Sequence, residues 1–222
     1  MNPRILAIGD VHGCLTALDA LLAFVQLQPD DTLIFLGDYI DRGPDSRGVL
    51  ERLVELSARP NTIFLRGNHD LWMENAREDR QWFTSWFHGG VGGLETLKSY
   101  GTFADVPLAH WQFLDNLVEY YETENEIFVH GAVDANEELF DQPQQVLLWE
   151  RVDDQAPHFS GKRVICGHTS QKNGLPLDRG FAVCIDTFCC GGGWLSALDV
   201  TTNRVWQANQ AGETRAGRLG EI

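Results

Sequence analysis

Aspartate and histidine side chains follow two short apolar segments near the start of the chain. Asp10 and His12 come after the segment 4–8, and Asp38 comes after the segment 32–36. Asp10 and His12 are two residues apart, so in an extended chain both side chains point to the same side and can bind one ion. The carboxylate of Asp38 has two oxygens, enough to bridge two ions. Taken singly, a Gly-Asp pair after a strand is more often just a turn.

A second set of nitrogen and oxygen ligands follows later strand-like segments, at Asn68, His130 and His168. Carboxylate, imidazole and amide groups without a thiolate suit manganese, iron or zinc and do not decide among them. Two such ions, about 3.5–4 Å apart, are a common device for in-line attack at phosphorus. The sequence therefore predicts a two-metal site formed by Asp10, His12, Asp38, Asn68, His130 and His168.

The first 70 residues alternate segments typical of strands and helices. Short apolar runs predict strands at 4–8, 32–36 and 62–65, and apolar residues at helical spacing predict helices at 15–25 and 45–57. Alternation of this kind implies parallel strands with helical crossovers. In such sheets the ligand crevice lies beyond the carboxyl ends of the strands, where the polar residues above are found.

The rest of the chain predicts a helical, aromatic-rich cap at about 71–121 and a return to strands after it. The expected strands are 127–129, 164–166, 182–185, 195–200 and 204–207, the last two forming a hairpin. This C-terminal half favours antiparallel pairing, and the residues from about 212 onward are expected to be frayed. We expect one α/β domain over 1–222 with two facing mixed β-sheets.

Charge and composition limit the partners of the chain. Among 222 residues, Lys and Arg number 17 and Asp and Glu number 32, which gives a net charge of −15. Such acidity, without a basic run, disfavours binding to nucleic acids. No apolar run reaches the roughly 20 residues that span a bilayer. Five cysteines without a CxxC pair or an export signal predict reduced thiols in the cytoplasm. We expect a cytoplasmic monomer that binds neither nucleic acid nor membrane.

Five motifs, in this order, resemble those of one enzyme family. The set GDVHG, GDYIDRG, RGNHD, FVHG and CGHT resembles the phosphoprotein phosphatase family of dinuclear metallophosphatases, in particular its small bacterial and phage serine/threonine phosphatases. The match covers about 4–200. It implies a calcineurin-like metallophosphoesterase fold, with two facing mixed sheets flanked by helices. Asp70 is a departure, since eukaryotic members carry Glu there.

The resemblance also implies a role for each matching residue. Asp10 and His12 would bind the first metal, Asp38 would bridge, and Asn68, His130 and His168 would bind the second. The catalytic residues would be His69, the proton donor; Asp41, its orienting carboxylate; and two phosphate-binding arginines, Arg42 and, by the loosest alignment, Arg151. The cofactors would be two divalent ions, Mn²⁺ first, with iron or zinc as alternatives.

The resulting hypothesis is a metal-dependent phosphomonoesterase. Its substrates would be phosphoserine and phosphothreonine in phosphoproteins or phosphopeptides, with phosphotyrosine as an extension, attacked in line by a hydroxide bound to both metals. The alternative is a dinucleoside tetraphosphate (Ap4A-type) or other nucleotide hydrolase. The segment 189–193, CCGGG, resembles that branch, whereas Asp41 departs from its Ala-Arg-Gly pattern. A non-catalytic binding module is a third possibility, and nuclease action is disfavoured by the acidity.

Overall fold

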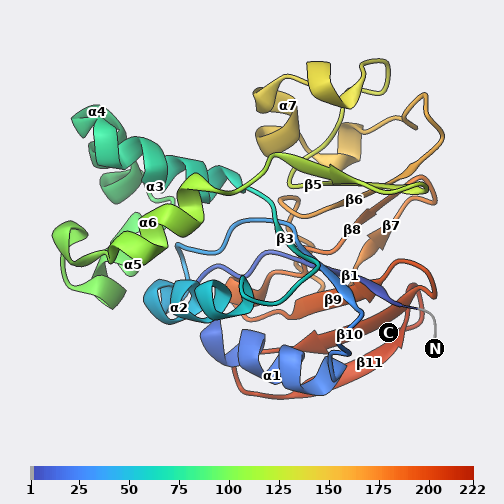
Figure 1. The fold of residues 1–222 in the computed structure, drawn as a ribbon, viewed down its shortest axis with the longest axis horizontal. Helices are drawn as coiled ribbons and strands as arrows, with labels where there is room; N and C mark the ends of the chain where they lie inside the picture. Colours follow the sequence, from blue (N-terminus) through green and yellow to red (C-terminus); the bar gives the residue numbers. More distant parts are fainter. Residues whose placement is uncertain (1–2) are drawn as a thin grey trace.

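The computed structural model describes residues 3–222 and places its strands in two sheets (Figure 1). The larger sheet is built from β1 (Ile5–Ile8), β2 (Thr32–Phe35), β3 (Thr62–Phe64), β9 (Leu195–Asp199), β10 (Arg204–Ala208) and β11 (Thr214–Arg218), in the order β11-β10-β9-β1-β2-β3. The smaller sheet is built from β4 (Tyr120–Glu122), β5 (Glu126–Val129), β6 (Arg163–Cys166), β7 (Leu177–Asp178) and β8 (Ala182–Cys184), in the order β4-β5-β6-β8-β7.

Seven α-helices accompany the sheets in the described part of the chain. They are α1 (Leu15–Val25), α2 (Ser46–Leu56), α3 (Asn68–Glu78), α4 (Arg80–His88), α5 (Gly93–Tyr100), α6 (Leu108–Asp115) and α7 (Gln144–Trp149). Figure 1 shows α1 below the larger sheet, α7 above the smaller sheet, and α3 to α6 to one side of both. Among residues 3–222 no helix is long and apolar enough to cross a membrane.

The core between the sheets follows from the two-residue period of the strands. Ala7 and Ile34 of the larger sheet belong to one buried cluster with Phe128 and Ile165 of the smaller sheet. The neighbours of Ala7 on β1 pack instead in a cluster that contains the apolar face of α1. Because successive side chains of a strand point to opposite faces, each central strand is covered by the other sheet on one side and by helices on the other.

The parallel arrangement predicted for the first three strands is confirmed. β1 pairs with β2 and β2 with β3 in parallel, so their carboxyl ends lie at one edge of the sheet. Asp45 is the N-cap of α2, since its carboxylate accepts a hydrogen bond of 2.8 Å from the amide of Gly48. These features fix the loops that carry the first motifs.

The antiparallel tendency expected of the C-terminal half is confirmed, because β4–β5, β7–β8, β1–β9, β9–β10 and β10–β11 all pair antiparallel, whereas β5, β6 and β8 run parallel to one another. One expectation for this half is wrong. The residues beyond 212 are not frayed, because β11 pairs with β10 over five residues. Its sequence, TRAGR, lacks an apolar face, which is typical of a solvent-exposed edge strand.

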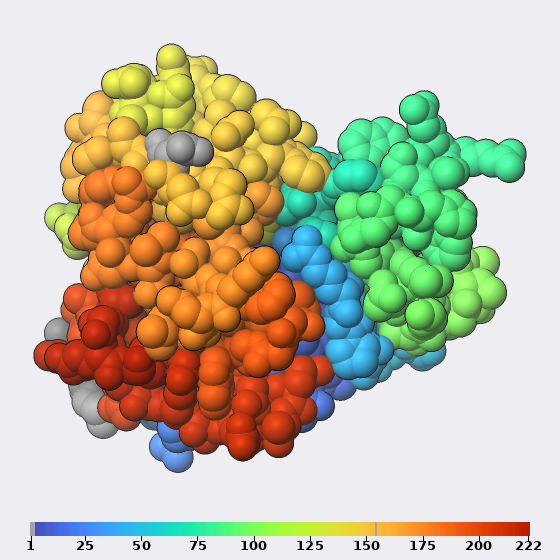
Figure 2. Space-filling view, turned by 180° about the vertical axis from the view of Figure 1, so that it is seen from behind, coloured from blue at the N-terminus to red at the C-terminus, as the bar shows by residue number. Residues whose placement is uncertain are grey.

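The cap begins earlier than expected and ends just before its predicted limit. Its first helix, α3, starts at Asn68, and the segment returns to the smaller sheet with β4 at Tyr120. Buried Trp86 packs edge-on against Phe83 and Phe103, with ring centroids 6.2 and 5.8 Å away. In Figure 2 the cap forms a green lobe beside the rest of the molecule. The surface is hollowed between the two, where residues near the N-terminus, in blue, are visible.

Candidate metal centre

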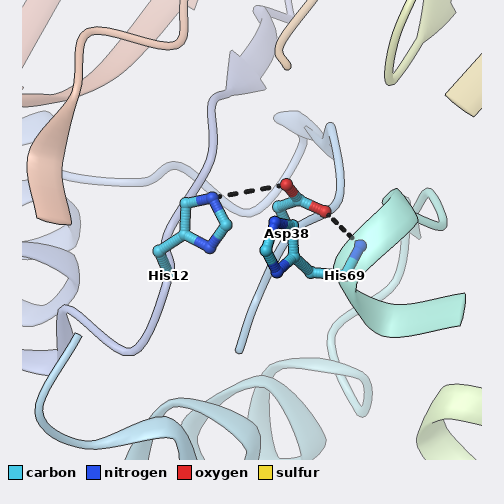
Figure 3. A group of neighbouring side chains, drawn as sticks. All are labelled: His12, Asp38 and His69. Carbon is cyan, nitrogen blue, oxygen red and sulfur yellow. Dashed lines mark hydrogen bonds and ion pairs between the residues drawn. The ribbon is translucent and has the colours of Figure 1, made fainter. Parts of the chain in front are cut away.

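The predicted ligands converge at the carboxyl ends of the strands. In one group a ring nitrogen of His12, a ring nitrogen of His69 and a carboxylate oxygen of Asp38 lie within 4.8 Å of one another. In a second group Asp38 is joined in the same way by His130 and His168. Figure 3 shows the first group, with Asp38 between His12 and the backbone amide of His69. The structure therefore forms two neighbouring clusters of donors with one shared carboxylate.

Asp38 has the geometry of a bridging ligand. Its Oδ2 lies 3.3 Å from Nε2 of His12, and its Oδ1 lies 3.4 Å from Nε2 of His130. Oδ1 also accepts a 2.9 Å hydrogen bond from the amide of His69. A side chain at Gly67 would place its Cβ 2.1 Å from the same oxygen, so only glycine lets the start of α3 approach this closely.

Backbone carbonyls select the ring nitrogen that each metal-binding histidine presents. Nδ1 of His12 lies 2.8 Å from the carbonyl of Ile40, and Nδ1 of His130 lies 2.9 Å from that of Leu36. His168 is reversed, with Nε2 3.0 Å from the carbonyl of Trp149. A carbonyl only accepts, so these nitrogens carry the proton and the other nitrogen of each neutral ring keeps a lone pair. All three free nitrogens face Asp38 or Asn68.

Asn68 and Asp10 complete the predicted ligand set to different degrees. Oδ1 of Asn68 lies 2.9 Å from His130 Nε2 and 3.1 Å from His168 Nδ1, which places it in the second cluster. Asp10 is buried, but its oxygens accept the amide of His168 at 3.1 and 3.2 Å and it belongs to neither three-residue group. His69 takes that place in the first cluster.

The electrostatics of the buried cluster match a cation site. Burial, opposed by Asp38, lowers the pKa of His12 to about 3; burial and the neighbouring His130 lower that of His168 to about 4. Both rings are thus neutral, the form that binds metals. Burial opposes charge on His130, yet Asp38 and Asp10 raise its pKa to about 10. A divalent cation would replace that proton and balance the acidic pair. The donors present fit two divalent ions.

Arg42 reaches into the same cluster from the loop after β2. Its guanidinium lies 3.1 Å from Nε2 of His12 and 2.9 Å from Nε2 of His69. The lone pair of His12 cannot both accept from Arg42 and bind a cation. Binding a metal at His12 would therefore release this end of the guanidinium, which forms bidentate hydrogen bonds with phosphate oxygens readily.

His69 and Asp41 form the predicted pair. Nδ1 of His69 lies 2.8 Å from Oδ2 of Asp41, which is fully buried. Two cap residues hold that carboxylate: the indole of Trp86 donates to Oδ2 at 2.9 Å, and the hydroxyl of Thr96 donates to Oδ1 at 2.7 Å. The carboxylate therefore orients the ring, and Nε2 of His69 faces the guanidinium of Arg42 at 2.9 Å.

A cavity of about 520 Å³ opens over these groups. Its lining residues are Asp38, Arg42, Arg151, His168, Ser170, Lys172 and Phe188. Arg151, the second predicted arginine, thus reaches the cavity, although its guanidinium also donates to the exposed carboxylate of Asp153 at 2.8 and 3.0 Å. The predicted residues that meet here come from segments more than 100 residues apart.

Two buried carboxylates near the ligands were not among the predicted site residues. Asp70 accepts hydrogen bonds from the amides of Asp38, Tyr39 and Gly67 at 2.8, 3.0 and 2.9 Å, and so shapes the loop of the bridging ligand. Asp186 directly follows the strand-like segment 182–185, the same signal that identified Asp10 and Asp38. It accepts from Ser170 Oγ at 2.5 Å and from the amide of Phe188 at 3.0 Å.

The remaining histidines and the cysteines serve packing. His110 is buried and lies 2.7 Å from the Tyr100 hydroxyl, and His158 is buried against Ser160 at the same distance. His88 ends α4 at the surface. All five cysteines are free thiols, four of them buried.

Known proteins resemble this chain in sequence over about 65 residues and in fold over almost its whole length. The chain is 49% identical over 65 residues to the symmetrical bis(5'-nucleosyl)-tetraphosphatase of Pectobacterium carotovorum strain PC1, and 44% identical over 66 residues to that of Legionella pneumophila strain Lens. Each match covers 29% of this chain, and 22% and 23% of those relatives. The chain thus matches less than a quarter of the length of either relative.

Solved structures match almost the entire chain at low identity. A candidate diadenosine tetraphosphatase superposes with a TM-score of 0.66 at 23% identity, covering 98% of this chain and 94% of the other. A protein-tyrosine phosphatase from Shewanella gives 0.63 at 18%, covering 96% and 80%, and a serine/threonine phosphatase from Saccharomyces cerevisiae gives 0.60 at 17%, covering 100% and 81%. At these identities the likeness concerns the fold alone.

A family model decides the classification. The model described as calcineurin-like phosphoesterase matches residues 3–184, which is most of the chain and includes every predicted metal ligand. The fold predicted from the motifs is thereby confirmed, and the family implies a hydrolase that uses divalent metal ions. The chain belongs to the calcineurin-like phosphoesterase family.

Proposed function

We propose that this chain is a metal-dependent phosphatase that cleaves phosphomonoesters with poor leaving groups, such as phosphoserine and phosphothreonine in peptides. The observation that carries the proposal is the buried His69–Asp41 pair beside the metal cluster, with Nδ1 and Oδ2 2.8 Å apart. A serine alkoxide leaves poorly, so the reaction needs a proton donor at the leaving oxygen. A histidine oriented by a buried carboxylate supplies such a donor.

The other residues divide binding and charge between them. The two cations, when bound, would supply a nucleophilic water at neutral pH and polarise the phosphoryl group. Their ligands would be Asp38 between both sites, His12 with Asp10 on one side, and Asn68, His130 and His168 on the other. Arg42 and Arg151, which line the cavity above the ligands, would hold the phosphoryl oxygens. Asp70 keeps the Asp38 loop in place.

A second candidate function is hydrolysis of dinucleoside tetraphosphates. It is supported by the relatives named above as symmetrical bis(5'-nucleosyl)-tetraphosphatases, which the chain matches at 49% and 44% identity over 65 and 66 residues. Each match covers 29% of this chain, so this support concerns the chemistry at phosphorus more than the leaving group. The comparisons nonetheless favour this substrate class over phosphoproteins.

A substrate panel separates these functions. The purified protein is loaded with Mn²⁺, Zn²⁺ or Fe²⁺ and assayed with a phosphoserine peptide, a phosphotyrosine peptide, p-nitrophenyl phosphate and diadenosine tetraphosphate. Turnover of the phosphoserine peptide above that of the dinucleotide supports the first function, and the reverse order supports the second. A protein that turns over none of the four with any metal is a binding module, and the proposal fails.

A further inference from the structure

Lys172 provides a third cation in the cavity, outside all the recognised motifs. It lies on the loop between β6 and β7, and it lines the cavity together with Arg42 and Arg151. Its Nζ lies 5.9 Å from the centre of the Phe188 ring, at the outer limit of a cation–π contact. Among the described side chains no carboxylate pairs with Lys172, whereas Arg151 is paired with Asp153. Its charge is therefore available to a ligand.

The wall that carries Lys172 is held together by Asp186. The carboxylate of Asp186 accepts from Ser170 Oγ at 2.5 Å and from the amide of Phe188 at 3.0 Å, and its carbonyl accepts from the amide of Gln171 at 2.8 Å. Asp186 is 3% exposed, so these hydrogen bonds are shielded from water. The two segments that border the cavity are thus fixed relative to each other.

Phe188 is fixed in its turn by an unusual backbone conformation. Its φ is +63°, in the left-handed region that bulky residues seldom adopt. A Cβ at Gly191 would lie 2.0 Å from the Phe188 ring, so the ring lies directly against this glycine. The ring is held as a rigid wall beneath the ammonium group.

The size and charge of the cavity exceed what a single phosphoryl group requires. A cavity of about 520 Å³ falls within the roughly 300–1,000 Å³ typical of sites for complete small molecules. Two arginines and two cations already answer the charge of one phosphate. The exposed ammonium of Lys172 adds a positive charge to this cavity beyond the two arginines, and a ligand with a further negative charge beyond the reacting phosphoryl group would pair with it.

We propose that Lys172, held over Phe188, forms a second phosphate subsite for the leaving group of a nucleoside oligophosphate. This inference rests on the proposed phosphohydrolase chemistry and supports its second substrate class. In the reaction the water oxygen bonds to phosphorus and the bond from phosphorus to the bridging oxygen breaks. The electron pair stays on the departing phosphate, whose charge Lys172 balances. One water proton is released, and the other remains with the new phosphate.

Kinetics of point variants test the subsite. The variants are Lys172→Met, which removes the charge, Lys172→Arg, which keeps it, and Phe188→Leu, which removes the ring. We expect the ratio of kcat/KM for diadenosine tetraphosphate to kcat/KM for p-nitrophenyl phosphate to fall about tenfold in Lys172→Met, mainly through KM, because one charged hydrogen bond is lost. The fall in Phe188→Leu should be smaller, and Lys172→Arg should retain most of the ratio. A ratio that stays constant in Lys172→Met overturns the inference.

The matched control is Lys98→Met on α5, whose exposed ammonium lies 3.6 Å from Glu95. Its ratio of kcat/KM values and its activity should equal those of the wild type.

Calorimetric titration with adenosine diphosphate gives a readout that does not depend on turnover. The wild type should bind it more tightly than inorganic phosphate, and Lys172→Met should lose that preference. A wild type that cleaves p-nitrophenyl phosphate but neither cleaves the dinucleotide nor prefers the diphosphate overturns the subsite and leaves the proposed function intact. Inactivity on every substrate, with the binding preference present, overturns the proposed function and leaves the subsite intact.

Discussion

At the scale of single residues, the site depends on which nitrogen each histidine offers. Main-chain carbonyls hold one ring nitrogen of His12, His130 and His168, so the other nitrogen of each ring already faces the cluster before a metal binds. His69 differs, because its partner is the carboxylate of Asp41. The buried carboxylate of Asp41 orients the His69 ring from Nδ1, whereas main-chain carbonyls orient the other three rings. This difference in partner suggests a proton donor in His69 and metal ligands in the other three.

Replacing His69 tests that assignment. In His69→Asn the leaving oxygen loses its proton donor, so cleavage of a phosphoserine peptide should slow by about a hundredfold or more. Hydrolysis of p-nitrophenyl phosphate, whose leaving group needs little protonation, should slow by less than about tenfold. Steady-state kinetics with the two substrates measure the difference. An equal loss on both would remove His69 from the acid role and leave it as a metal ligand, as its place in the first cluster also allows.

At the scale of elements, the cap reaches into the catalytic pair. Trp86 on α4 and Thr96 on α5 donate to the carboxylate of Asp41, which itself lies on the loop after β2. The loop is further fixed where the amide of Arg42 donates to the carbonyl of Gly92 just before α5. The helices of the cap therefore position the acid pair as well as covering the core.

Removing one cap hydrogen bond should weaken catalysis while the fold persists. In Trp86→Phe the ring volume is largely kept, but Asp41 loses the indole donor at 2.9 Å. We expect kcat for the phosphoserine peptide to fall about three- to tenfold, which corresponds to one hydrogen bond of about 1 kcal/mol, with KM nearly constant. Trp82→Phe in the same helix is the control, because Trp82 is partly exposed and does not contact Asp41. If both variants behave alike, the cap does not act through Asp41.

The free energy of unfolding depends on pH through one acidic side chain, Asp31, which lies between the end of α1 and the start of β2. Burial alone would raise the pKa of Asp31, but Arg4 and the amide of Gln28 outweigh it and keep the pKa below 3.8. Arg4 also donates to the carbonyls of Val25 and Gln26 at the end of α1. Because the folded state holds the ionised form, this contribution is complete above about pH 4. It is lost as the pH falls through the lower folded pKa.

Urea unfolding at several pH values measures that contribution. Asp31→Asn should lower the free energy of unfolding by about 1–2 kcal/mol at pH 7, and the loss relative to wild type should shrink as the pH falls below 4. Asp19→Asn is the matched control, since Asp19 is exposed and its 3.0 Å pair with Arg52 is solvated; it should change stability by less than about 0.5 kcal/mol. A loss that is the same at pH 3 and pH 7 would contradict the ionic origin.

At the scale of the whole molecule, the two sheets are joined by the metal cluster. Asp10, Asp38 and Asn68 follow strands of the larger sheet, and His130 and His168 follow strands of the smaller one. Asp10 and Asp38 are both buried, and burial together with Asp186 and Asp38 raises the pKa of Asp10 well above its usual value, so carboxylate charge is costly here without cations. Ions bound between the two sheets would offset this cost through shared ligands and link metal binding to stability.

Thermal unfolding of chelator-treated protein tests this link. Addition of Mn²⁺ at about 100 times its dissociation constant should stabilise the fold by about 2.7 kcal/mol, which raises Tm by roughly 5–10 °C for a chain of this size. Asp38→Asn, which removes the shared carboxylate charge, should show a much smaller rise. Ca²⁺ serves as a control of the same charge that prefers oxygen ligands. Equal shifts with both metals, or no shift in the wild type, would contradict a nitrogen-rich two-cation centre.

Much of the site was predictable because most of its ligands belong to short motifs of neighbouring residues. Asp10, His12, Asp38 and Asn68 each stand directly after a short apolar segment, and parallel strands place their carboxyl ends together. The same rule would have identified Asp186. The position of β11 was not predictable in this way, because an edge strand needs no apolar face and its only signal is the partner strand β10.

The sequence by itself determined the set of ligand types and the sheet edge at which they gather, since both depend on residues close together along the chain. Only the tertiary structure decided the partners of those residues. Asp10 contacts the amide of His168 across 158 positions, Trp86 finds Asp41 across 45, and Lys172 joins the two arginines in one cavity. Such contacts depend on how two sheets and a cap pack, and packing is fixed by complementary shape over the entire core.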